Sequence, residues 1–288
     1  MIILKDEILS NYTSYRVGGK AKYFIKVISN DDVGVAINFA ERLSMNYVLL
    51  GAGSNILFMD EGFDGVVIYT GLLNRWLIEK DNYILVGAGV KLSELVEFSV
   101  DRGVSGFEEL AGIPGSVGGA VNMNAGAFNT EIKDVLTECV AYDMVRKGII
   151  SLSNADCKFG YRIAEGLKNR IVLFAKFKKM YGDKKYLKSK VDEILKKRDS
   201  KQPLEYPSCG SVFKRPKGDY AGRLIEECGL KGYRIGGAMV SEKHANFIVN
   251  LGDAKAKDIL DLIEFVQNEV YKKFNILLEP EVKIIKNI

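Results

Sequence analysis

Residues 108–128 read EELAGIPGSVGGAVNMNAGAF, and no charged side chain occurs from Leu110 to Phe128. The stretch contains five glycines and four alanines. It is too apolar for a solvated linker, and its glycines disfavour a regular helix or strand. Main chain without bulky side chains lets a flat ligand lie directly against it, and consecutive free amides, expected around Gly115–Gly119, suit a pyrophosphate. The alternative is a close crossing of chain segments with no ligand.

A second glycine-rich loop lies in LLGAGSNILFM, residues 49–59. The third glycine of a G-x-G-x-x-G fingerprint would fall at Ile56, and strand-like residues follow where that fingerprint needs a helix. Residues 51–55 are therefore predicted to be a tight loop between two strands, either a plain turn or a nest for an anion. With RVGG at residues 16–19, three such segments favour a dinucleotide held without a Rossmann helix.

The composition excludes several classes of protein. A chain of 288 residues predicts two or three domains, and a net charge of +4 suits an anionic small ligand without indicating nucleic acid. The single histidine, His244, excludes any multi-histidine metal site, and a Ser-His-Asp triad is conceivable only through it. The four cysteines show no metal-ligand spacing, and the charged N-terminus does not resemble a signal peptide. We expect a cytoplasmic protein with no membrane span.

Hydrophobic periodicity predicts short strands, each punctuated by glycine, with occasional helices. An amphipathic helix is predicted over residues 29–46, capped by Ser29 or Asn30. A basic helix that starts at residue 184 and ends before Pro203 is predicted to lead into another domain, and Asp253 is predicted to cap a long helix at 253–275. Strands are predicted at 22–28, at 47–50 and 56–59 on either side of the 51–55 loop, and at 64–70, 83–90, 136–144, 148–152, 170–181 and 276–285. The predicted buried stripes are Val33, Ala36, Ile37, Ala40 and Leu43 in the first helix and Ile259, Leu260, Ile263, Val266 and Val270 in the last.

Several motifs, in the same order and nearly from end to end, resemble the UDP-N-acetylenolpyruvoylglucosamine reductase family. They are TSYRVGGKA, LGAGSNIL, GFEELAGIPGSVGGAVNMNAGAF, PSCGSVFKRP, AGRLIEECGLKG, IGGAMVSEKHANFIVN and LEPEVKII. The resemblance implies an α+β chain, with a two-subdomain FAD-binding fold of the vanillyl-alcohol-oxidase/PCMH type and a smaller α/β substrate-binding domain. The expected boundaries are 1–70, 71–185 and 186–288. The short segment from Phe159 to Tyr186 is similar to that of the shorter, second class.

The same resemblance implies an enzyme of peptidoglycan synthesis. NADPH would give hydride to noncovalently bound FAD, and the enolpyruvyl group of UDP-N-acetylglucosamine enolpyruvate would then be reduced to UDP-N-acetylmuramate. The expected partners are these small molecules alone, and the chain is expected to be a monomer. Two alternatives stay open: an oxidase of the same fold with a tethered flavin, and a nucleotide-binding module without catalysis.

Three residues match the family's catalytic groups: Ser211 as proton donor, Arg162 as partner of the developing enolate, and Glu281 as the opposite acid group. Without the family, Ser211 reads as a turn residue, Arg162 as a surface arginine, and Glu281 as a solvated carboxylate like Glu279. Where relatives usually carry serine two positions after the arginine, this chain has Ala164. We do not expect Cys209 to be catalytic.

The remaining residues carried over would bind ligands. The cofactor-binding residues are Gly19, Gly51, Ala52, Gly53, Ser54, Asn55, Gly112, Ile113, Pro114, Gly115, Ser116, Gly118, Gly119 and Ala120. His244 would contact the sugar nucleotide or serve only as a structural hydrogen-bonding group. Lys214, Arg215 and Arg223 would contact the diphosphate of the substrate, with plain solvent exposure as the alternative.

Overall fold

The computed structural model describes residues 1–287, and the chain forms two compact units. The first unit contains residues 1–5, 23–52 and 65–197, and the second contains residues 6–22, 53–64 and the chain from Arg198 onward. Each unit has its own hydrophobic core. The second unit thus joins two N-terminal segments to the C-terminal third. The division into domains at residues 70 and 185 stays a prediction.

A four-stranded sheet of order β1-β2-β5-β3 belongs mostly to the first unit. Its strands are β1 Ile2–Ile8, β2 Lys20–Lys26, β5 Phe63–Tyr69 and β3 Tyr47–Leu50. Helix α1, Asn30–Arg42, begins after Ser29, which forms a capping box with Asp32. The predicted inward residues of α1 are buried except Leu43, which is 46% exposed because the helix ends one residue earlier.

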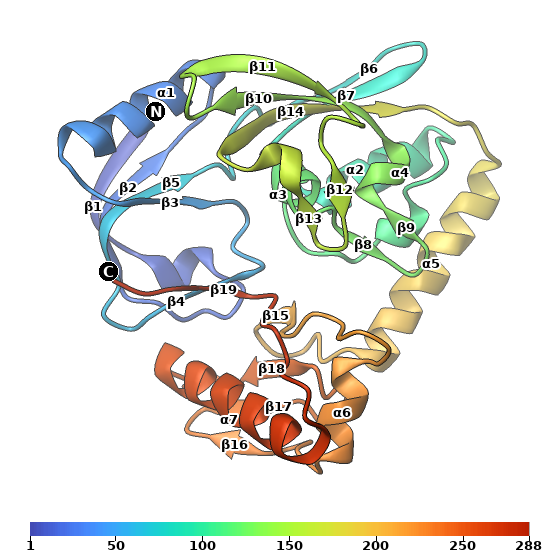
Figure 1. The fold of residues 1–288 in the computed structure, drawn as a ribbon. Helices are drawn as coiled ribbons and strands as arrows, with labels where there is room; N and C mark the ends of the chain where they lie inside the picture. Colours follow the sequence, from blue (N-terminus) through green and yellow to red (C-terminus); the bar gives the residue numbers. More distant parts are fainter. Residues whose placement is uncertain (288) are drawn as a thin grey trace. The chain divides into compact units, whose positions relative to one another are not determined.

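A five-stranded sheet of order β11-β10-β14-β7-β6 forms the rest of this unit's framework. All its neighbouring strands run antiparallel. Figure 1 shows α2, α3 and α4 together on one side of this sheet. The strands are β6 Leu77–Glu79, β7 Tyr83–Gly87, β10 Leu136–Asp143, β11 Gly148–Ser153 and β14 Arg170–Lys178. The helices are α2 Leu92–Asp101, α3 Val117–Asn122 and α4 Ile132–Val135.

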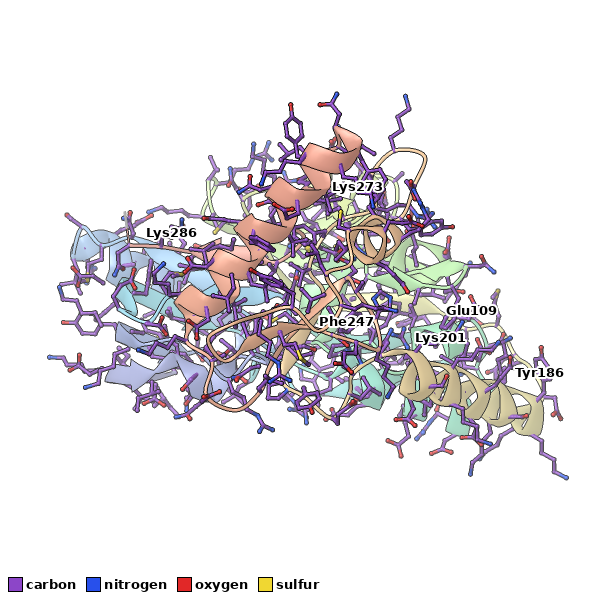
Figure 2. The ribbon with its side chains drawn as sticks, turned by 90° about the horizontal axis from the view of Figure 1, so that it is seen from below. Glu109, Tyr186, Lys201, Phe247, Lys273 and Lys286 are labelled. Carbon is purple, nitrogen blue, oxygen red and sulfur yellow. The ribbon has the colours of Figure 1, made fainter. Side chains whose placement is uncertain are left out.

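Two short hairpins and a long helix complete the elements before the last third of the chain. The hairpins are β8 Gly126–Ala127 with β9 Thr130–Glu131, and β12 Phe159–Gly160 with β13 Ile163–Ala164. Helix α5, Lys184–Lys201, agrees with the predicted basic helix. Figure 2 labels Tyr186 and Lys201 near its two ends and shows side chains projecting outward between them.

The second unit is built on a four-stranded antiparallel sheet of order β15-β18-β17-β16. Helix α7 packs along this sheet and contacts β16, β17 and β18 (Figure 1). A parallel pair, β4 with β19, brings the C-terminal end of the chain beside residues 56–58. The elements are β4 Ile56–Phe58, β15 Ser208–Ser211, α6 Ala221–Glu227, β16 Arg234–Ile235, β17 Ala238–Val240, β18 Phe247–Asn250, α7 Ala256–Phe274 and β19 Lys283–Ile285.

The start of α7 corrects one prediction. The helix begins at Ala256, and Asp60 accepts hydrogen bonds from the amides of Ala256 and Lys257 at 2.8 and 3.0 Å. Asp253 is therefore not the cap. Asp258 accepts the Lys255 amide at 2.9 Å, and the next two amides are capped by Asp60, which is distant in sequence and cannot be found from helical periodicity. The predicted stripe is buried except Leu260, which is half-buried, and it also includes Ala256 and Leu262. Among residues 1–287, no helix combines the length and hydropathy needed to cross a membrane.

Candidate active site

A bulge in β15 determines where Ser211 points. Ser208 pairs with Val249 and Ser211 pairs with Phe247, so one extra residue lies on the β15 side. Gly210 takes up this bulge with a φ of +73°, a conformation that favours glycine. With strict alternation Ser211 would share the inward side of the buried Cys209, because side chains repeat every second residue. The bulge turns Ser211 to the other side, where it is half-buried.

The chain that follows Ser211 lies against the segment that carries Glu281. The Glu281 amide donates to the Val212 carbonyl at 2.7 Å, and the Lys214 amide donates to the Glu279 carbonyl at 2.9 Å. Phe213 and Pro280 form a bridge between these two hydrogen bonds. The structure therefore brings the main chains at Ser211 and Glu281 together, as the predicted roles require. This contact precedes β19, and Pro280 forms only an isolated bridge, so the strand predicted at 276–285 is present only as β19.

Two residues near Ser211 have structural roles. Asn55 donates through Nδ2 to the Glu281 carbonyl at 3.1 Å, and its own carbonyl accepts from the Lys283 amide at 3.1 Å. It thereby ties the 53–55 turn to the Glu281 segment. Burial raises the pKa of Cys209 to about 12, so its thiol stays protonated at neutral pH. This agrees with the expectation that Cys209 is not catalytic.

The candidate cations of the second unit already have protein partners. Lys214 forms an ion pair with Glu279, and the Arg215 guanidinium lies 4.0 Å from the centre of the Tyr220 ring. Arg223 donates from Nε to Asp219 at 2.7 Å, and this bonding holds the pKa of that carboxyl down to about 2. Arg223 is therefore paired within the protein, with Asp219 just before α6 and Arg223 in the first turn of that helix.

His244 is half-buried in the same unit, with its ring 4.8 Å from that of Phe247. Its Nδ1 accepts the Asn246 amide at 3.2 Å. Burial lowers the pKa of His244 below its usual value, and this effect outweighs the opposing hydrogen bond to its own main chain. The ring is therefore neutral at pH 7, with Nδ1 occupied and Nε2–H as its donor.

In the first unit, the two glycine-rich loops meet. A Cβ built on Gly51 would lie 3.2 Å from the Ser116 hydroxyl oxygen. Within residues 1–287, the amides of Gly51, Ala52, Gly115 and Ser116 donate no hydrogen bond to the protein. Ala52, Gly112, Pro114 and Gly119 are exposed around them. These amides could hold an anion, because unpaired N–H groups in successive residues form a concave positive surface.

The expectation of consecutive free amides through Gly119 is wrong. The Val117 amide donates to the Val90 carbonyl at 2.8 Å, and the Gly118 amide donates to the Ala88 carbonyl at 2.9 Å. The Gly119 amide donates to the Ser116 hydroxyl at 3.3 Å, because Ser116 caps α3. Gly19 is similar, since its amide donates to the Met59 carbonyl at 3.0 Å. Hydrogen bonds between closely packed chain segments therefore occupy these amides.

Arg162 lies at the tip of the β12–β13 hairpin of the first unit, with a φ of +57°. A left-handed non-glycine residue is strained, and such residues are frequent at functional sites. Ala164 is buried and pairs with Phe159 at the base of the hairpin. The buried Asn124 holds the hairpin by donating to the Gly160 carbonyl at 3.0 Å. Sequence reasoning missed Asn124, and its only signal was an asparagine among glycines and alanines.

Similarity to known proteins decides the family. Residues 202–285 match the family model of the UDP-N-acetylenolpyruvoylglucosamine reductase C-terminal domain, and residues 21–146 match that of the FAD binding domain. A UDP-N-acetylenolpyruvoylglucosamine reductase from Caldicellulosiruptor bescii is 44% identical over 98% of this chain and 90% of its own. One from Clostridium novyi is 45% identical over 98% and 92%. The chain belongs to the UDP-N-acetylenolpyruvoylglucosamine reductase family.

Solved structures agree with this assignment to the family. The UDP-N-acetylenolpyruvylglucosamine reductase from Thermus caldophilus has a TM-score of 0.85 and 36% identity, over 99% of this chain and 98% of its own. A 6-hydroxy-D-nicotine oxidase from Arthrobacter nicotinovorans has a TM-score of 0.50 at 15% identity, over 62% of this chain and 42% of its own, which shows a shared fold alone. The predicted α+β FAD-binding fold with a further C-terminal domain is confirmed.

The reductase is a flavoprotein oxidoreductase, and FAD is its cofactor. The residues present fit that group, because the unpaired amides at 51–52 and 115–116 lie in a part of the chain without charged side chains to repel an anion. In the described part of the chain, no three His, Cys, Asp or Glu side chains are close enough to hold a metal ion.

Proposed function

We propose that the chain reduces the enolpyruvyl group of UDP-N-acetylglucosamine enolpyruvate to UDP-N-acetylmuramate, with NADPH as the source of hydride and Ser211 as the source of the proton. This reaction would make it an enzyme of peptidoglycan synthesis. The names of its relatives support the substrate. The observation that supports the role of Ser211 is the β15 bulge, which takes this half-buried residue out of alternation with the buried Cys209, next to the Val212 carbonyl that the Glu281 amide binds. We further expect a monomer working in the cytoplasm.

When bound, FAD supplies hydride for the vinyl carbon of the substrate. The protein must then stabilise charge and deliver one proton. Addition of hydride builds negative charge toward the substrate carboxylate, and the planar guanidinium of Arg162 suits that group. Ser211 protonates the adjacent carbon, and Glu281 lies with its main chain against the segment that follows Ser211. Among residues 1–287 the Ser211 hydroxyl has no hydrogen-bond partner, so no protein contact competes for its proton.

The ligand contacts in this proposal are of two kinds. The amides of the two glycine-rich loops would hold the pyrophosphate of FAD. Neutral His244 would offer Nε2–H to an oxygen of the UDP diphosphate. Lys214, Arg215 and Arg223 would add to this contact only by giving up their present partners. We therefore expect His244 to contribute more to substrate affinity than Arg223.

The experiment that tests this function separates the two halves of the reaction. In stopped-flow absorbance, Ser211→Ala should slow flavin reoxidation by the enolpyruvyl substrate by about 10²–10⁴-fold, the range for loss of a general acid. Flavin reduction by NADPH should stay within about twofold of wild type.

The matched control is Ser208→Ala, which removes another half-buried hydroxyl from β15 before the bulge. It should leave both halves unchanged. Equal losses in both halves for Ser211→Ala would reject Ser211 as proton donor. A wild-type protein that bleaches with NADPH but is not reoxidised by the substrate would reject the proposed substrate.

A further inference from the structure

Asn246 fixes the chain directly after Ser211. It is 8% exposed, and its side chain exchanges two hydrogen bonds with the main chain of Phe213. The Phe213 amide donates to Oδ1 at 3.0 Å, and Nδ2 donates to the Phe213 carbonyl at 2.9 Å. The Asn246 carbonyl also accepts the Val212 amide at 2.8 Å. Three hydrogen bonds from one residue thus fix Val212 and Phe213.

The side chain of Asn246 replaces a missing strand partner. β15 ends at Ser211 and its partner β18 starts at Phe247, so regular pairing stops where Phe213 needs a donor and an acceptor. A buried main-chain group without a partner costs about 1–3 kcal/mol, and the carboxamide provides both groups. On the other side of this segment, the Glu281 amide donates a hydrogen bond to the Val212 carbonyl. Residues 212–213 are therefore held from both sides.

Asn246 also holds His244. Its main-chain amide donates to His244 Nδ1 at 3.2 Å. A nitrogen that accepts a hydrogen bond carries no proton, so the proton of the neutral ring is on Nε2. The same residue therefore determines the tautomer of the histidine and the course of the chain after the serine.

We propose that Asn246 is a positioning residue for reduction of the substrate, which directs the Ser211 hydroxyl through Val212–Phe213 and holds His244 as its Nε2–H tautomer. The inference rests on the proposed function of Ser211. Asn246 acts through the main chain of its neighbours. Its loss should therefore affect the step that needs the proton and leave flavin reduction unchanged.

Asn250 provides a matched control. It lies four residues further along, at the end of β18, and is 3% exposed. Its Nδ2 donates to the Tyr15 carbonyl at 2.8 Å, and its Oδ1 accepts the amides of Gly252 and Ala254 at 2.8 and 3.1 Å. Asn246→Ala and Asn250→Ala both remove a buried carboxamide that bonds to main chain. Only the first removes bonds to the residues after Ser211.

The kinetic test is stopped-flow absorbance on the FAD-loaded full chain. We expect Asn246→Ala to slow flavin reoxidation by the enolpyruvyl substrate by about 10–100-fold, because small displacements of a reacting group have effects of this order. Reduction by NADPH should change by less than about twofold in both variants, and Asn250→Ala should also keep normal reoxidation. Equal reoxidation rates in the two variants would overturn the inference. A wild type that the substrate does not reoxidise would instead overturn the proposed function.

A second readout needs neither cofactor nor substrate. Since His244 is the only histidine, ¹⁵N-histidine labelling gives a single imidazole in the NMR spectrum. Wild type and Asn250→Ala should show the Nε2–H tautomer, with Nδ1 unprotonated. Asn246→Ala should show a weaker preference for this tautomer, because the turn keeps its hydrogen bonds at Ser241 and Phe247 but loses those of the carboxamide to Phe213. The nearby charges of Lys231 and Glu226 are the same in all three proteins.

A third variant covers failure of Asn246→Ala to fold. Asn246→Asp keeps an oxygen for the Phe213 amide, removes the donor to the Phe213 carbonyl and adds a negative charge at a buried position. The inference expects slower reoxidation by about 10-fold or more, with unchanged flavin reduction. Wild-type reoxidation in Asn246→Asp, together with an unchanged histidine tautomer, would overturn it.

Discussion

The loops at residues 51–55 and 112–120 are both rich in glycine, but the structure uses their glycines differently. In the first loop, the amides of Gly51 and Ala52 donate to no protein group within residues 1–287. In the second loop, the amides of residues 117–119 donate hydrogen bonds to Val90, Ala88 and Ser116. Glycine content predicts close approach of the main chain, but not what approaches it. An amide left without a partner points to a ligand, and a filled amide points to packing.

The largest expected effect concerns Gly53, in the first loop. A Cβ there would lie 1.8 Å from the Tyr12 carbonyl oxygen, and φ is +71°. A clash with main chain adds about 1–3 kcal/mol to a conformational cost of about 1–2 kcal/mol, so Gly53→Ala should lower the free energy of unfolding by about 3 kcal/mol or more.

Urea unfolding followed by circular dichroism measures this loss. Gly210→Ala is the control, because Gly210 has a similar φ of +73° and nothing within 4 Å of its Cβ position. It should lose only the conformational part, about 1–2 kcal/mol. Equal losses in the two variants would show that the Tyr12 contact does not restrict residue 53.

Much of the architecture followed from residues close together in sequence. The period of α1 placed Val33, Ala36 and Ile37 in the core, and the G-x-G loop was correctly predicted to join two strands rather than a strand and a helix. Local pattern fails where a partner is distant in sequence. Asp60 caps α7 across about 200 residues, and the amides after Ser116 bond to residues 88–90. The sequence contains both partners but not their pairing.

Motif matching likewise found Ser211 and Glu281 but not the residues that hold them. Asn246 and Asn124 act through bonds to main chain at Phe213 and Gly160, and such bonds have no sequence signature. The β15 bulge was equally invisible, because a glycine before a serine also suits an ordinary turn. The roles of Ser211 and Glu281 remain predictions, to be tested by kinetics.

The second prediction compares two adjacent glycines of the 112–120 loop. A Cβ on Gly118 would lie 2.8 Å from the Ala88 Cβ, whereas a Cβ on Gly119 would meet only the Ser116 hydroxyl, at 3.5 Å. Gly118→Ala should therefore lower the free energy of unfolding of the apoprotein by about 1–3 kcal/mol. Gly119→Ala should raise it by about 0.5–1 kcal/mol, because alanine favours the helix.

FAD titration of the apoproteins adds the functional half of this test. Gly119 is exposed beside the unpaired amides of Gly115 and Ser116, so an added methyl group there should weaken FAD binding in a stable protein. If Gly119→Ala binds FAD as wild type does, the second loop serves packing at this position as well, and the ligand role shifts to residues 51–52 and 115–116.

The smallest expected effect concerns His244, whose burial makes the stability of the protein depend on pH. Burial lowers the pKa of the folded imidazole below the value of about 6.5 in the unfolded chain. As the pH falls, the unfolded state therefore binds a proton at a higher pH than the folded state does. The stability contributed by the neutral ring is complete above about pH 7 and is lost progressively from about pH 6.5 down to the folded pKa. His244→Gln lacks this proton and should show a flatter stability profile between pH 7.5 and about 5.5. Urea unfolding of both proteins across that range measures the difference, and the α-amino group cancels because both have it. Parallel profiles would mean that the ring is as solvated in the folded protein as in the unfolded chain, which would contradict its burial against Phe247.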